Sequence, residues 1–80
     1  MTLEYIKDAV LNGGNGGVYF SYNGNNAGFD TEVEDGVFTF QSWYGEDAKN
    51  YDSFEDMSQD KFFGGKSLAD LVEKVDMEFC

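Results

Sequence analysis

The feature that most constrains this fold is an apolar–polar alternation that runs through residues 17–44 and is interrupted at Asp35-Gly36. A period of two is typical of a β-strand with one buried face, and Asp-Gly between two such runs is the strongest short signal for a two-residue hairpin turn. A second turn is indicated at residues 23–26, where asparagine and glycine accept positive φ. We therefore expect three strands, over residues 18–22, 27–34 and 37–44.

The hairpin turn also sets the register of the strands. Two turn residues at Asp35-Gly36 pair Glu34 with Val37. The same register continues through the pairs Val33–Phe38, Thr31–Phe40 and Asp30–Gln41. A slip by one residue would turn the aromatic rings to water, so the pattern favours this register. It gathers one apolar face made of Val18, Phe20, Tyr22, Phe29, Thr31, Val33, Phe38 and Phe40.

Helical patterns lie on both sides of the strands. Residues 2–12 predict a helix with Thr2 as its N-cap. Residues 52–55 have the form of a capping box and predict a short helix over 53–60. Ser67 precedes a last helix whose apolar residues share one face, namely Leu68, Leu71, Val72 and Val75.

The remaining segments complete the predicted fold. Residues 45–50 are polar and are expected to form a loop, whereas Met77 and Phe79 are expected to dock on the core. The prediction is a single α+β domain over residues 1–80 in the order α-β-β-β-α-α. Its sheet is a three-stranded antiparallel meander, packed by helices on its apolar face.

Charge limits the partners that such a domain can bind. Sixteen acidic residues face five lysines, without arginine or histidine, for a formal net charge of −11. This field repels nucleic acid, which needs a basic footprint, and it repels anionic membrane surfaces. It attracts basic proteins and accelerates encounter with them, although acidity can also serve solubility alone. We expect a basic protein as partner, a nucleic-acid-binding protein among the candidates, and no direct contact with nucleic acid or membrane.

The rest of the composition favours a cytoplasmic location. No run approaches the ~20 apolar residues of a membrane span. Residues 1–5 lack the basic start of a signal peptide. Cys80 is the only cysteine, which fits a reducing compartment. Its thiol is interpreted as incidental, with an intermolecular disulfide as the alternative, and the chain is expected to be a monomer or a weak dimer.

Two segments resemble known ligand-binding motifs but lack essential positions. Residues 64–67 match the end of a phosphate-binding loop, yet Asp60 stands where that pattern requires glycine, so we interpret them as a glycine turn followed by an N-cap. Residues 30–36 lack the glycine position and the final glutamate of a calcium loop. Catalysis is also disfavoured, because the chain has no histidine and little scaffold for a carboxylate-lined cleft. We therefore predict no enzyme, no cofactor and no metal site.

The candidate binding site is the polar face of the predicted sheet. Asp30, Glu32 and Glu34 recur at every second residue, ~6.6 Å apart, and Asp35 follows in the turn. Tyr19 and Trp43 share this face with Thr39 and Gln41, and aromatic residues amid charge are favoured as interface anchors. Further acids are expected to extend the site along one edge, namely Glu46, Asp47, Asp52, Glu55, Asp56 and Asp60. The alternative is an ordinary solvated strand face.

In its length, its acidity, its lack of catalytic residues and its predicted element order, the chain resembles the small phage-encoded anti-CRISPR proteins that block Cas nucleases. The resemblance covers the order of elements over the whole chain, and no shared motif assigns roles to individual residues. It implies an inhibitor that mimics nucleic acid and competes where Cas9 reads its PAM or holds the guide–target duplex. The alternative is a protein-interaction module that binds through Tyr19 and Trp43, with its charge serving solubility.

Overall fold

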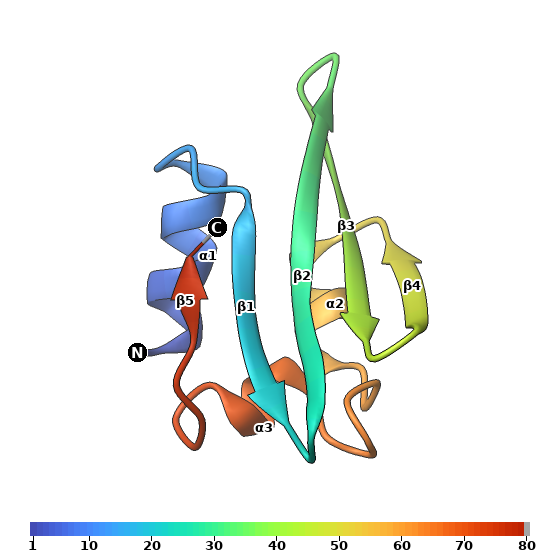
Figure 1. Cartoon of the computed structure of the whole chain (residues 1–80). Coiled ribbons are helices and arrows are strands. Elements are labelled where there is room, and N and C mark those ends of the chain that lie inside the picture. Colours follow the sequence, from blue (N-terminus) through green and yellow to red (C-terminus); the bar gives the residue numbers. More distant parts are fainter. Residues whose placement is uncertain (80) are drawn as a thin grey trace.

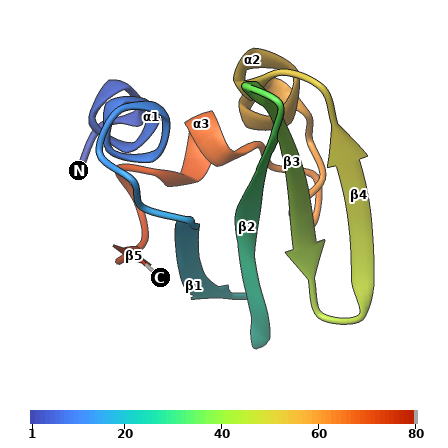
Figure 2. The same cartoon turned by 90° about the horizontal axis from the view of Figure 1, so that it is seen from above.

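The computed structural model describes residues 1–79 and shows a small α+β domain with one five-stranded sheet. All pairings in the sheet are antiparallel, and the strand order is β4-β3-β2-β1-β5. The helices lie together on one side of the sheet, as Figures 1 and 2 show. The expectation for the Cys80 thiol lies outside the described residues. The elements are α1 (Leu3–Leu11), β1 (Gly17–Tyr22), β2 (Asn25–Glu34), β3 (Val37–Tyr44), β4 (Asp47–Tyr51), α2 (Phe54–Gln59), α3 (Leu68–Leu71) and β5 (Glu78–Phe79).

The central three strands form the predicted meander in the predicted register. Glu34 pairs with Val37, and Asp30 pairs with Gln41. Both turns have positive φ at their two central residues, 51° and 78° at Asn23-Gly24 and 53° and 78° at Asp35-Gly36. Turns of this kind match the right-handed twist of the strands, which explains why asparagine, aspartate and glycine occupy them.

The predicted loop over residues 45–50 is wrong, because Asp47–Tyr51 form a fourth strand paired with β3. Gly45, with a φ of 60°, begins a two-residue turn that returns the chain directly onto β3. Only Tyr51 of β4 is buried, so this strand has no apolar alternation to reveal it. Its position is secured by Asp60, which accepts hydrogen bonds from Tyr51 Oη and Lys49 Nζ, each at 2.7 Å.

The C-terminal tail docks on the core, as expected, but it does so as a strand. Glu78 pairs with Tyr19 and Phe79 with Val18, while the preceding Met77 is buried. The element order is therefore α-β-β-β-β-α-α-β rather than α-β-β-β-α-α, and the sheet has five strands rather than three.

Each helix is preceded by an N-cap residue whose side chain accepts a backbone hydrogen bond. The hydroxyl oxygens of Thr2 and Ser53 accept hydrogen bonds from the backbone N–H groups of Tyr5 and Asp56. The second helix is thus capped by Ser53, one residue later than the Asp52 capping box predicts. Residues 64 and 65 form a turn with positive φ, and Ser67 caps α3 in a capping box with Asp70, in agreement with the interpretation of this segment as a turn and cap.

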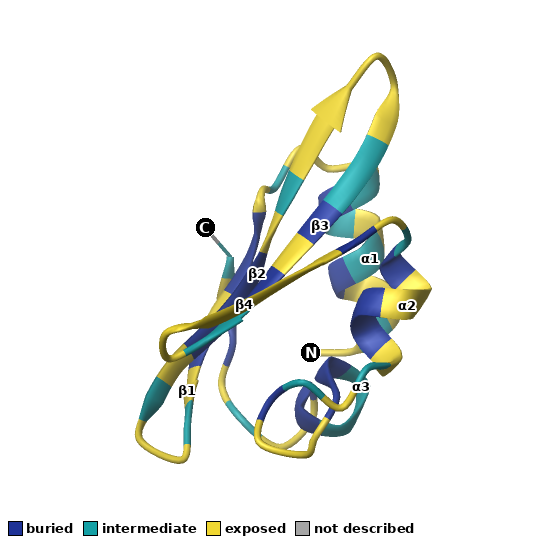
Figure 3. Ribbon diagram, turned by 90° about the vertical axis from the view of Figure 1, so that its right-hand side faces the viewer, coloured by how far each residue is buried: buried dark blue, intermediate teal, exposed yellow. Residues whose placement is uncertain are grey.

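The core lies between the sheet and the helices and is mainly aromatic. Phe29 is fully buried at its centre, where its ring contacts Phe40 and Phe54 edge-to-face at centroid distances of 6.3 and 6.0 Å. Such pairs add to the free energy gained from removing the rings from water. The tip of the β2–β3 hairpin extends beyond this core, as the exposed end in Figure 3 shows. Val33 therefore lies on the predicted apolar face and yet remains 58% exposed.

Candidate functional site: the outer face of the sheet

The face of the sheet opposite the helices, here called the outer face, is built from rows of directly paired residues. Residues that pair across antiparallel strands point to the same side of the sheet, so the register identifies the members of each row. One row carries Asp30 with Gln41 and Asn50, and the next two carry Glu32 with Thr39 and Glu34 with Val37. A further row crosses all five strands as Glu78, Tyr19, Gly28, Trp43 and Ala48.

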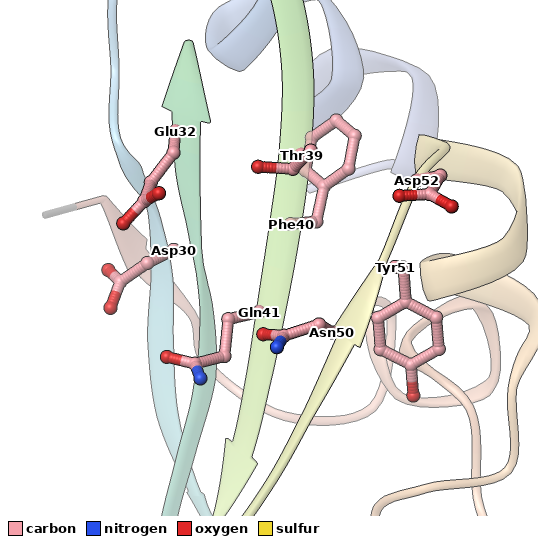
Figure 4. Close-up of a pocket in the computed structure, with 8 residues that line it drawn as sticks. All are labelled: Asp30, Glu32, Thr39, Phe40, Gln41, Asn50, Tyr51 and Asp52. Atoms are coloured by element: carbon pink, nitrogen blue, oxygen red, sulfur yellow. The ribbon is translucent and has the colours of Figure 1, made fainter. Parts of the chain in front are cut away.

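Asp30, Glu32 and Glu34, here called the acidic ladder, are all exposed on β2. Asp30 and Glu32 border a first hollow of about 410 Å³ on the outer face, and Asp52 adds a third carboxylate to it. Figure 4 shows the side chains of Asp30, Glu32 and Gln41 on one side of the sheet and the rings of Phe40 and Tyr51 on the other. The ladder thus lies beside amide and hydroxyl groups that can donate or accept hydrogen bonds, which are Thr39, Gln41 and Asn50.

A second hollow of about 550 Å³ lies on the same face, over the row that contains Gly28. Because Gly28 has no side chain, the indole of Trp43 lies across its backbone, with Cζ2 and Cη2 each 2.7 Å from where a Cβ would stand. Tyr19, 44% exposed, pairs with Gly28 from the opposite strand. The residues around this hollow include Tyr19, Ser21, Asn26, Trp43, Asp76 and Glu78.

The lysines lie away from these hollows. Three form ion pairs on the helix side and at the sheet edge: Lys7 with Glu55 at 2.9 Å, Lys49 with Asp60 at 2.7 Å and Lys61 with Asp70 at 2.7 Å. Lys49 belongs to β4 but pairs with buried Ser42, so it points away from the outer face. Lys66 and Lys74 are in the segments on either side of α3. Within residues 1–79, therefore, carboxylates border both hollows and no lysine borders either.

These ion pairs change the acidity of their carboxyl groups. The hydrogen bond from Lys7 lowers the pKa of Glu55. Hydrogen bonds from Lys49 and then Tyr51 lower the pKa of Asp60, and hydrogen bonds from Lys61 and the Ser67 backbone lower that of Asp70. Each of these three carboxylates thus interacts with a lysine of the same chain.

The structure brings together only part of the predicted site. Asp30, Glu32, Glu34, Tyr19 and Trp43 share the outer face as expected, and Asp52 joins the ladder at the first hollow. The other predicted acids lie elsewhere: Asp35 in the tip of the β2–β3 hairpin, Glu46 in the β3–β4 turn, Asp47 at the start of β4 opposite Tyr44, Glu55 and Asp56 on α2, and Asp60 beside Lys49.

Two acids of the outer face were not part of the predicted site. Asp76 and Glu78 border the second hollow because β5 returns to pair with β1. A strand of two residues has no period from which it could be recognised, so no signal in the sequence places them there.

Comparisons with protein-family models, with curated proteins and with solved structures give no match to this chain. Among residues 1–79, none of the helices has the length and apolar character needed to cross a membrane. The same residues contain no cluster of three or more histidine, cysteine or acidic side chains arranged to hold a metal ion.

Proposed function

We propose that this chain is a non-enzymatic, acidic binding protein of the cytoplasm that occupies the basic groove of a nucleic-acid-binding protein and so acts as a nucleic-acid mimic. The observation that carries the proposal is the separation of charge between the two sides of the sheet. Among residues 1–79, the outer face presents six exposed carboxylates, and no lysine borders its hollows. The six are Asp30, Glu32, Glu34, Asp52, Asp76 and Glu78. A Cas nuclease is the class of target that the resemblance to anti-CRISPR proteins implies.

The spacing of these carboxylates supports mimicry of a phosphate backbone. Duplex DNA carries one phosphate for about 3.4 Å of axis on each strand. Alternate residues of a strand lie ~6.6 Å apart, so the acidic ladder supplies one charge for about every second phosphate step. Glu78, on β5, is two strands away from β2, or about 10 Å, and adds charge beside the ladder.

The exposure of the ladder determines how it would act. Exposed charges are screened by salt, so each contributes little to affinity on its own and the set acts mainly on encounter and orientation. Acids gathered on one face steer a basic groove toward that face more effectively than the same charges spread evenly. Binding is thus expected to weaken steeply as ionic strength rises.

A second candidate function rests on the aromatic part of the outer face. Tyr19 is 44% exposed, and together with Trp43 it borders the second hollow. Aromatic residues of this kind are common binding anchors, so the protein would then be an interaction module whose acidity serves solubility. In that case Trp43→Ala would abolish binding, and neutralising the ladder would have little effect.

The proposal is tested by competition with nucleic acid. The chain is immobilised and incubated with lysate from a bacterium that expresses a CRISPR system, and retained proteins are eluted with duplex DNA or with the same ionic strength of sodium chloride. We expect nucleic-acid-binding proteins to be retained and to elute with DNA at a salt concentration that does not release them. A mimic and a nucleic acid compete for one groove, so DNA displaces the target specifically.

The matched variants for this experiment each remove three negative charges. The outer-face variant carries Asp30→Asn, Glu32→Gln and Glu34→Gln, and the helix-side variant carries Glu4→Gln, Asp56→Asn and Glu73→Gln. The outer-face variant should lose the captured proteins, whereas the helix-side variant should keep them. Capture of nothing, or of proteins that DNA does not displace, would refute mimicry; retention by the outer-face variant with loss in Trp43→Ala would favour the interaction module.

A further inference from the structure

The second hollow has a chemical character that the acidic ladder lacks, because its walls combine aromatic rings with carboxylates. Trp43 and Tyr19 lie on opposite sides of Gly28 in one cross-strand row. A Cβ at residue 28 would stand 2.2 Å from the carbonyl oxygen of Val18 and 2.7 Å from the indole, so only glycine lets the indole of Trp43 lie against the strand here. The row therefore places two aromatic rings on the outer face beside the second hollow.

The carboxylates that border the second hollow belong to the β5 edge of the sheet. Glu78 pairs with Tyr19 on the neighbouring strand, and Asp76 lies two residues before it; both are exposed and both border the hollow. The ion pairs found within residues 1–79 involve neither of them. In the described part of the chain, two carboxylates thus border the same hollow as two aromatic rings, and no lysine borders it.

This combination selects one class of ligand. Anions are repelled by the carboxylates, and an apolar group would leave Asp76 and Glu78 without a counterpart. A cation gains from the negative face of an aromatic ring and from the carboxylates together. Among protein cations, the guanidinium of arginine is planar, stacks on rings and presents five donors in a fork that fits carboxylates, whereas the lysine ammonium is compact and strongly hydrated.

We infer that the second hollow is a binding site for one arginine side chain of the partner protein. The inference rests on the proposed function and names the group that the outer face recognises beside the acidic ladder. The guanidinium stacks between or upon the rings of Tyr19 and Trp43, and its N–H groups donate to Glu78 and Asp76. Ser21 and Asn26 border the same hollow and supply a hydroxyl and an amide for the remaining donors or for bridging water.

The site and the ladder have different roles on the same face. The exposed ladder steers a basic surface by long-range attraction, whereas the hollow holds one side chain by contact. Basic grooves that bind nucleic acid carry arginine for bidentate recognition, so an arginine-selective recess suits the proposed target. Because Asp30, Glu32 and Glu34 do not border the second hollow, the two contributions can be separated by mutation.

The fluorescence of Trp43, the only tryptophan, gives a direct test in the intact chain. The chain is titrated with N-acetyl-arginine methylamide, and in parallel with the lysine and citrulline equivalents, at constant ionic strength. We expect a saturable change with arginine, half-saturation at about fivefold higher concentration with lysine, and no response to the uncharged citrulline compound. The amide of Gly28 and the indole N–H of Trp43, followed by NMR, should shift in the same titration.

Substitutions around the second hollow test whether the fluorescence response to arginine arises there. Asp76→Asn with Glu78→Gln should weaken arginine binding about fivefold or more, and Tyr19→Leu should weaken it to a similar extent while leaving Trp43 as the reporter. The control Glu4→Gln with Asp56→Asn removes the same charge from α1 and α2 and should change half-saturation less than twofold. Equal responses to arginine and lysine, a response to citrulline, or equal weakening by the control would overturn the inference, as would unchanged fluorescence and NMR spectra.

The outcome is distinguishable from failure of the proposed function. The ladder variant Asp30→Asn, Glu32→Gln, Glu34→Gln should bind the arginine compound within twofold of the original chain. If no nucleic-acid-binding protein is captured, the arginine site still stands on this titration. If the titration fails while capture depends on the ladder, the mimicry proposal stands and the arginine site is wrong.

Discussion

The two sides of the sheet differ in their ion pairs within residues 1–79. On the helix side and at the β4 edge, Glu55, Asp60 and Asp70 each hold a lysine in an ion pair. On the outer face, the acids of the ladder make no ion pair within the described part of the chain. Within residues 1–79, the acidic residues thus include carboxylates that pair with a lysine and exposed ladder carboxylates that form no ion pair.

This contrast also explains why the outer face can carry so much charge in a small domain. Repulsion among exposed carboxylates is weakened by water and salt, and the fold is stabilised instead by the aromatic core on the other side of the sheet. Substitutions should accordingly affect stability on one side and binding on the other.

The largest effect on stability is expected at Phe29. Removing its ring leaves a cavity among Phe40 and Phe54, so Phe29→Ala should lower the free energy of unfolding by about 3–5 kcal/mol, measured by urea denaturation. If this variant does not fold, Phe29→Leu should still show a loss of ~1 kcal/mol. Thr39→Ala on the outer face should change stability by no more than ~0.5 kcal/mol, and an equal loss at the two positions would contradict the contrast between the faces.

A smaller loss is expected at Tyr51, which anchors the edge strand β4 by donating a hydrogen bond to Asp60. Tyr51→Phe should lower the free energy of unfolding by about 1–2 kcal/mol at pH 7. Burial, followed by the hydrogen bond to Asp60, raises the pKa of Tyr51 above its ordinary value of 10.0. A raised pKa means that the stabilisation is complete below pH 10 and is lost as pH rises further. The variant should therefore approach the original chain in stability above pH 10, and a constant difference would exclude this role for the phenol.

The smallest stability effect is expected at Asp70, whose pKa is lowered by Lys61 and by the Ser67 backbone. A lowered pKa means that the stabilisation is complete above the ordinary value of 3.8 and disappears as pH falls through the lower folded value. Asp70→Asn should thus be less stable than the original chain at pH 6, and the difference should shrink toward pH 2 in thermal unfolding. Asp30→Asn, on the ladder, should show no comparable loss at pH 6.

The sequence was sufficient to predict the three-stranded meander because its turn residues and its strand alternation are local signals that indicate the same register. Asp35-Gly36 dictates a tight turn, and only one register buries Phe29 and Phe40 on the same side. The ladder follows directly from that register, since the residues between the buried ones must face outward.

The two strands that the sequence did not predict, β4 and β5, lack the pattern that a buried face imposes. The residues of β4 before Tyr51 are exposed, and β5 has two residues, so neither strand carries the alternation that burial imposes. Their positions depend on contacts distant in sequence, such as Tyr51 with Asp60 and Phe79 with Val18. For the same reason, the sequence could not show that Asp76 and Glu78 border the same hollow as Tyr19. Nor could it show that Glu55 forms an ion pair with Lys7.

The most direct test of the central claim compares the two sides of the sheet in binding. The affinity of the DNA-displaced partner is measured at 50 and 200 mM salt for the original chain, the outer-face triple variant and the helix-side triple variant. We predict that the outer-face variant binds about tenfold or more weakly at 50 mM and depends less on salt, whereas the helix-side variant stays within about twofold. Equal losses in the two variants, which carry the same net charge, would show that total acidity rather than the outer face determines binding.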